Sequence, residues 1–125
     1  MGLLSGFLGH GASVDPAELE RRLDGVLIDG EEPRLAFKLI RDFFVFTQWR
    51  LILVNIQGMT GSRVDYDSIP YRSITRFSVE TAGTFDLDSE LKIWISGHMN
   101  PIEKTLNKGS DIRGIQRALA SGILR

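Results

Sequence analysis

The chain has 125 residues, the length of one domain, and a hydrophobic fraction of 42% that can build a core without cross-links. Its 15 basic residues are balanced by 16 acidic ones, so it lacks the basic excess typical of nucleic-acid-binding proteins. It contains no cysteine, which excludes disulfides, thiolate metal sites and cysteine nucleophiles and fits a reducing compartment such as the cytoplasm.

Residues 1–13 predict a flexible, glycine-rich tail in front of a single domain that covers residues 14–125. The tail lacks the basic start and the small-residue cleavage site of a signal peptide. No apolar stretch reaches the roughly 20 residues that a membrane-spanning helix needs. An alternative role for the tail is docking on another subunit or on a membrane surface through Leu3, Leu4, Phe7 and Leu8.

A short helix is expected to begin near Asp15. Asp15 is a good N-cap, Pro16 suits the first helical position, and Glu18 has the spacing of a capping box. Leu19 and Leu23 then lie on one face of the helix, so this face should pack against the rest of the domain.

The middle of the chain predicts a series of short strands. Runs of β-branched and aromatic residues are separated by turn residues such as glycine, proline and aspartate. This spacing indicates an antiparallel sandwich or barrel. The expected strands cover residues 35–41, 43–47, 50–56, 63–69, 71–81, 90–96 and 102–106.

The end of the chain changes from strand to helix periodicity. Ser110 is the expected N-cap, and Asp111 in the first turn favours the helix dipole. Apolar side chains then recur at helical spacing, so one face of this C-terminal helix should meet the core. They are Ile112, Ile115, Leu119 and Ile123, and Arg113 and Arg117 lie off their stripe.

Short motifs spread over residues 14–123 resemble a known family. They are KLIRD (38–42), FT (46–47) before RLILV (50–54), QGMTG (57–61), SIPYRSI (68–74), FSVETAG (77–83), DLDSELKIW (86–94) and the final helix. Together they resemble the small stand-alone pleckstrin-homology (PH)-like domains of bacteria. The resemblance implies a mainly β fold: a seven-stranded antiparallel PH-like sandwich, a capping C-terminal helix and a short N-terminal helix. It also implies no catalysis, no cofactor and a tendency to form homo-oligomeric rings.

One departure concerns the PH domains of eukaryotes. Those that bind phosphoinositides cluster Lys and Arg around a long first hairpin loop, whereas here this connection is the short, charge-neutral pair Arg41-Asp42.

The central hairpin is apolar at consecutive positions, in residues 43–46 and 51–54. Because successive side chains of a strand point to opposite faces, both faces of this hairpin need cover. A sandwich core covers one face, and the other must meet the N-terminal helix, the tail or a second chain. We expect self-association, with cover from within the chain as the alternative. The candidate interaction residues, including a tryptophan at the hairpin tip and one on a later strand, are Phe44, Phe46, Trp49, Ile52, Val54 and Trp94.

Two pairs of basic residues have the spacing that places each pair on one face of a strand. If the strands are neighbours, the pairs form an anion patch suited to lipid phosphates. The alternative is ordinary solvated faces. The residues are Arg34, Lys38, Arg72 and Arg76.

Neither a metal site nor a catalytic site is expected. Asp86, Asp88 and Glu90 share one face of an extended strand, but the glycine of a calcium loop is missing, so we interpret them as a solvated acidic face. His10 and His98 lie in a tail and a loop, and no Ser-His-Asp unit is evident.

The sequence thus predicts a non-enzymatic, cytoplasmic PH-like module that assembles into a homo-oligomer and presents a surface to an unknown protein partner. The alternative is a peripheral adaptor for anionic lipid at the inner face of the membrane. No nucleic-acid partner is expected.

Overall fold

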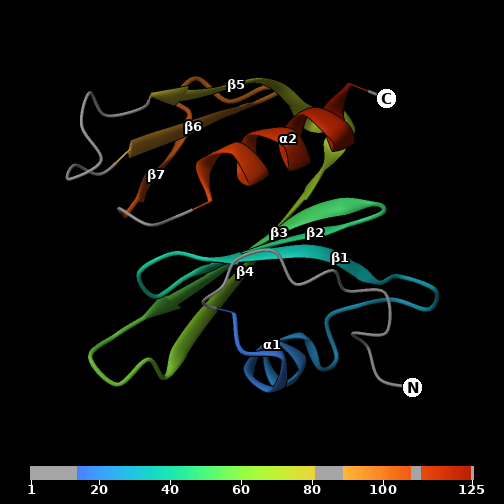
Figure 1. Ribbon diagram of the computed structural model, residues 1–125, viewed down its shortest axis with the longest axis vertical. Coiled ribbons are helices and arrows are strands. Elements are labelled where there is room, and N and C mark those ends of the chain that lie inside the picture. Colours follow the sequence, from blue (N-terminus) through green and yellow to red (C-terminus); the bar gives the residue numbers. More distant parts are fainter. Residues whose placement is uncertain (1–13, 81–88, 108–110, 125) are drawn as a thin grey trace.

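The computed structural model describes residues 14–80, 89–107 and 111–124, which form two antiparallel sheets and two α-helices (Figure 1). The first sheet has the order β1 (Pro33–Lys38), β2 (Phe43–Thr47), β3 (Arg50–Gln57) and β4 (Arg63–Pro70). The second has the order β5 (Ile74–Glu80), β6 (Ser89–Ile95) and β7 (Ile102–Leu106). The helices are α1 (Pro16–Leu23) and α2 (Ile112–Ile123), and a 3-10 turn, η1 (Tyr71–Ser73), joins the sheets. This is the mainly β architecture with terminal helices that the sequence predicts.

Asp15 caps α1 and Pro16 begins it, as expected, whereas the capping box of α1 and the cap of α2 differ from the prediction. The Asp15 carboxylate accepts a hydrogen bond from the Ala17 N–H, while Glu18 turns towards Lys38 at 3.5 Å and not back to the cap. In α2 the cap is Asp111, whose carboxylate accepts from the Gly114 N–H at 3.0 Å. The expected cap Ser110 lies outside the described residues.

The strand expected over residues 71–81 is interrupted at its start. Pro70 ends β4, and the chain makes the η1 turn before β5 begins at Ile74. Tyr71 leaves the strand path here, and its hydroxyl donates to the Thr47 carbonyl at 2.6 Å. The turn carries the chain from one sheet to the other, which a single continuous strand would not do.

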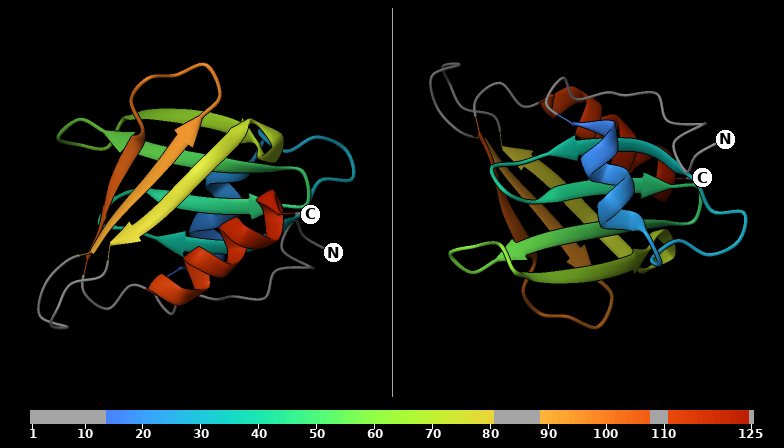
Figure 2. Two further views of the ribbon diagram at one scale, coloured as in Figure 1. Left: turned by 90° about the horizontal axis from the view of Figure 1, so that it is seen from above. Right: turned by 90° about the horizontal axis from the view of Figure 1, so that it is seen from below.

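The main core lies between the two sheets and is closed on one side by α2 (Figures 1 and 2). Ile115 and Leu119 of α2 are fully buried against it, as their helical spacing predicts. The inward side of the β2–β3 hairpin supplies Phe44, Phe46, Leu51 and Leu53.

The outward side of the same hairpin is covered by α1, which crosses this face of the sheet (Figure 2). Leu19 and Leu23 of α1 are fully buried there. They pack with Ala36, Phe43, Val45, Ile52 and Val54, all of which are also fully buried. The idea that a second chain is needed to cover this face is therefore wrong, because the chain covers it with its own N-terminal helix.

No helix among the described residues has the length and apolar character needed to cross a membrane.

Candidate functional site

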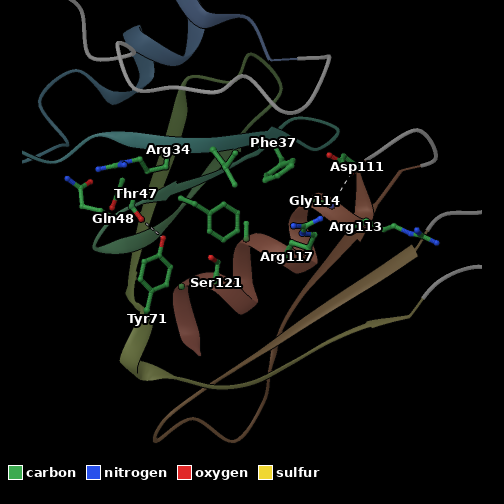
Figure 3. A pocket seen from close by; sticks show the side chains of 14 residues that line it. Arg34, Phe37, Thr47, Gln48, Tyr71, Asp111, Arg113, Gly114, Arg117 and Ser121 are labelled. Carbon is green, nitrogen blue, oxygen red and sulfur yellow. Dashed lines mark hydrogen bonds between the residues drawn. The ribbon is translucent and has the colours of Figure 1, made fainter. Parts of the chain in front are cut away.

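A groove of about 980 Å³ separates α2 from the β1–β2 hairpin (Figure 3). Its floor is apolar, with Leu35 and Phe37 from β1, Phe46 from β2 and Ala118 from α2. Its rim is polar and is formed by Arg34, Gln48, Asp111, Arg113, Arg117 and Ser121. The site thus combines an apolar base with charged and hydrogen-bonding groups around it.

Small residues on α2 face the groove and let neighbouring side chains approach the helix closely. Gly114, Ala118 and Gly122 recur every fourth residue and therefore lie on one face of the helix, the face that lines the groove. At Gly122 a Cβ would lie 2.6 Å from a carbon of the Tyr71 ring. A side chain at this position would push the ring and the helix apart.

Tyr71 closes one end of the groove. Its ring rests on α2 at Gly122, and its hydroxyl donates to the Thr47 carbonyl at the end of β2. Burial raises the pKa of the Tyr71 hydroxyl, and the negative charge of Glu31 raises it further. The hydroxyl therefore remains a hydrogen-bond donor and ties η1 to β2.

A buried ion pair between Glu31 and Arg50 holds Thr47, which lines the groove at the end of β2. The Glu31 side chain is 1% exposed, and Arg50 donates to its two oxygens from Nε and Nη2, both at 2.8 Å. The Thr47 hydroxyl donates to the same carboxylate at 2.8 Å. Burial raises the pKa of Glu31, but the hydrogen bonds from Arg50, the Ile28 N–H and Thr47 outweigh it and leave the pKa below its ordinary value. Glu31 is thus held ionised and fixes Thr47 beside the groove.

The six residues predicted as an interaction surface do not form one. Phe44 and Phe46 belong to the main core, whereas Ile52 and Val54 lie under α1. Trp49 is 49% exposed at the β2–β3 turn, where its ring approaches Gly30. Trp94 is half-buried on β6, and Arg76 Cζ lies 4.3 Å from its ring centroid. Phe46 alone among the six lines the groove.

The four residues of the predicted anion patch are also placed apart. β1 and β5 belong to different sheets, so Arg34 and Lys38 are not on a strand next to Arg76. Lys38 pairs with Glu18 on the α1 side, Arg76 covers Trp94, and Arg72 is exposed on η1. Arg34 lines the groove and lies where the register of β1 is irregular, between Pro33 and Leu35.

The acidic face is mostly beyond what the structure describes. Asp86 and Asp88 lie outside the described residues, as do His10 and the four apolar residues of the tail. Glu90 accepts a hydrogen bond from Thr105 at 2.9 Å. Within the described ranges no three His, Cys, Asp or Glu residues are grouped as metal ligands.

Sequence reasoning missed the part of the site that α2 contributes. Arg113, Arg117 and Ser121 follow at intervals of four and lie on one stripe beside the small residues of the helix. In the sequence, this polar stripe next to a row of Gly and Ala was the pattern that could have indicated a binding face on α2. The partner wall, however, comes from β1 and β2, about 70 residues earlier in the chain.

Comparisons with known proteins agree on one family. The chain matches the family model of the bacterial PH domain over residues 2–123. It is 52% identical to the uncharacterized protein YjqA of Bacillus subtilis, over 97% of this chain and 98% of that protein. It is also similar to the crystal structure of a PH domain from Shewanella amazonensis SB2B, with a TM-score of 0.82 and 51% identity over 94% of this chain and 95% of that one. A PH-domain protein from Shewanella loihica PV-4 gives a TM-score of 0.76 and 52% identity over 88% and 94%.

Proposed function

This chain belongs to the family of bacterial PH domains, and from that premise we propose that it is a non-enzymatic binding module that holds a segment of a protein partner in the groove between α2 and the β1–β2 hairpin. PH-type domains generally bind and do not catalyse. The groove is the observation that carries the proposal.

The shape and lining of the groove suit a bound segment. Its volume is at the upper end of the roughly 300–1,000 Å³ that is typical of ligand sites, and such sites also combine apolar walls with a few polar groups. β1 is an edge strand, and no strand among the described residues pairs with its outer edge. Partner segments commonly add to sheet edges of this kind.

The chemistry of the lining residues also favours binding over catalysis. Arg34, Arg113 and Arg117 offer hydrogen-bond donors and no acceptor, which suits them to bind a ligand and not to act as bases. The Asp111 carboxylate caps α2, and the Tyr71 hydroxyl is bound to a carbonyl and has a raised pKa. These groups are suited to holding a ligand in place.

A blocking variant tests the location of the site. Ser121 is exposed on the groove side of α2, so Ser121→Trp would fill the groove without entering the core. Gln116→Trp is the matched control, because Gln116 is exposed on α2 and does not line the groove. Peptides selected from a random display library on the wild type should bind Gln116→Trp equally and lose binding to Ser121→Trp. Undiminished binding to Ser121→Trp would contradict the proposal.

Self-association remains a prediction of the family resemblance. Since α1 covers the hairpin, contacts between copies would use the outer edges of β1, β4, β5 or β7, which no described strand pairs. Light scattering with a mass detector tests this, with an oligomer expected and a strict monomer at high micromolar concentration as the contrary result.

Peripheral binding to anionic lipid is the rival proposal. It would use Trp49, which is half-exposed, and the apolar side chains of the tail. Liposome co-sedimentation with and without residues 1–12 tests it. Equal, negligible binding by both forms would remove this rival.

A further inference from the structure

We propose that the groove selects an extended acidic segment in which carboxylates alternate with apolar side chains. This inference rests on the proposed function and names the chemistry of the partner. Its basis is the charge of the rim together with the apolar floor.

The rim of the groove carries three arginines. Among the described residues, no carboxylate forms an ion pair with Arg34, Arg113 or Arg117. Most other basic side chains that the structure describes are engaged: Arg22 and Lys38 with Glu18, Arg50 with Glu31, Lys92 with Glu103, Lys104 with Asp42, Arg41 with the Gly58 carbonyl and Arg76 with Trp94. The groove therefore gathers positive charge that no carboxylate of the described residues neutralises.

The charge of the rim has the opposite sign to that of the chain. Asp111 is the one acidic residue among the described lining residues, so three arginines leave a formal charge of +2, whereas the whole chain carries −1. The Asp111 carboxylate already accepts a hydrogen bond from the Gly114 N–H, as the N-cap of α2. Arginine binds carboxylates with two parallel hydrogen bonds, which gives such a rim geometric selectivity for acidic groups.

The positions of the arginines suit a segment that runs along the groove. Arg34 lies at one end beside Gln48, and Arg113 lies at the other end beside Asp111 (Figure 3). In an extended segment alternate side chains point to opposite sides. One set can rest on Leu35 and Phe37 while the other reaches the arginines. An isolated phosphate would use the rim and leave the apolar floor empty, which favours a peptide over a small anion or a lipid headgroup.

Binding of two labelled peptides of about ten residues, close to the length of a long strand, tests the inference. One alternates Leu and Glu, and the other alternates Leu and Lys. Fluorescence anisotropy should show binding of the Leu-Glu peptide, weaker binding at higher salt and no binding of the Leu-Lys peptide. Inorganic phosphate and anionic vesicles, added as competitors, should not displace the bound peptide.

Charge reversal on α2 locates the recognition. Arg113→Glu/Arg117→Glu should weaken binding of the Leu-Glu peptide by about tenfold. The matched control is Arg21→Glu/Arg63→Glu, which changes the net charge equally at two exposed arginines away from the groove and should leave binding unchanged. Thermal melting of each variant checks that it is folded.

The outcomes separate this inference from the proposed function. If both peptides bind equally and Ser121→Trp abolishes both, the groove binds peptides but the acidic preference is wrong. If the Leu-Glu peptide binds and neither Ser121→Trp nor the α2 charge reversal affects it, both proposals are wrong. Displacement of the peptide by vesicles or phosphate overturns the inference in favour of a phosphate ligand. Failure of the Leu-Glu peptide to bind at about 1 mM also overturns it.

Discussion

At the scale of single residues, Glu31 shows how a buried charge is held in this fold. Its carboxylate accepts hydrogen bonds from Arg50, Thr47 and the Ile28 N–H, and its side chain is 1% exposed. Nothing in the local sequence marks Glu31, because it follows a turn and its partners lie 16 and 19 residues further along the chain. Its role depends on the tertiary arrangement of β2 and β3.

Removal of this carboxylate should be costly. Glu31→Ala leaves the Arg50 guanidinium without its partner in a mostly buried setting, and we expect a loss of about 3 kcal/mol in the free energy of unfolding. Glu103→Ala removes a carboxylate that is 60% exposed and 3.7 Å from Lys92, and it should cost at most about 0.5 kcal/mol. Urea denaturation measures both. If Glu31→Ala lost as little free energy of unfolding as Glu103→Ala, the buried pair would not stabilise the fold.

The same residue should make stability depend on pH. Because the pKa of Glu31 is lower in the folded chain than its ordinary value of 4.5, the unfolded chain binds more protons in the window between these two values. The contribution of Glu31 is therefore present above pH 4.5 and is lost as the pH falls through the folded pKa. Urea denaturation between pH 6 and pH 3 should give a steeper loss for the wild type than for Glu31→Gln. Parallel curves would contradict the assignment.

At the scale of elements, the packing of α2 on η1 depends on the missing side chain of Gly122. Gly122→Ala improves helix propensity by about 1 kcal/mol, but it places a Cβ 2.6 Å from the Tyr71 ring. Overpacking of this kind costs up to about 3 kcal/mol, so we expect a net loss of about 1–2 kcal/mol in thermal or urea unfolding. Ser121→Ala, on the exposed neighbouring position, should change stability by less than about 0.5 kcal/mol.

Repeating Gly122→Ala in a Tyr71→Ala protein tests whether contact with the ring causes the loss of stability. In a Tyr71→Ala protein the ring is absent, so Gly122→Ala should become stabilising through its helix propensity. If Gly122→Ala destabilises both backgrounds equally, contact with the ring is not the cause.

By covering the apolar outward face of the β2–β3 hairpin, α1 should prevent nonspecific association through that face. Leu23→Ala opens the cover over Phe43 and Val54 and should cost about 2–5 kcal/mol. Exposure of this face should also increase binding of the dye ANS and raise the mass seen by light scattering relative to the wild type. Ala17→Gly, at an exposed position of the same helix, should show neither change beyond a small loss of helix propensity. An unchanged mass and ANS signal for Leu23→Ala would contradict this view of α1.

The elements that could be predicted are those with strong local signals. β2 and β7 have the predicted bounds, because short apolar or alternating runs are bordered by clear turns. The sequence showed that both faces of the β2–β3 hairpin are apolar, but it did not show what covers them. The outward face was expected to pack against a second chain, whereas it packs against the eight residues of α1. The basic patch failed for a related reason. The sequence shows which residues share one face of a strand, but it does not show which strands lie next to that strand in the sheet.

At the scale of the whole molecule, the chain divides its apolar surface into two buried layers and one open groove. The main core and the α1 layer are closed, while the space between α2 and the β1–β2 hairpin is open. Its rim carries arginines that form no ion pair with any carboxylate the structure describes. A chain with a net charge of −1 and a locally basic groove can attract an acidic partner to the groove in preference to the rest of its surface. From this distribution we expect recognition in the groove and not on the hairpin.

Backbone amide chemical-shift mapping by NMR, during titration with the Leu-Glu peptide, tests this placement most directly. The predicted result is a set of shifts confined to β1, the end of β2, Tyr71 and α2, with β4 and the outward face of α1 unchanged. Shifts centred on β4 or on the β2–β3 turn at Trp49, with α2 unaffected, would contradict it.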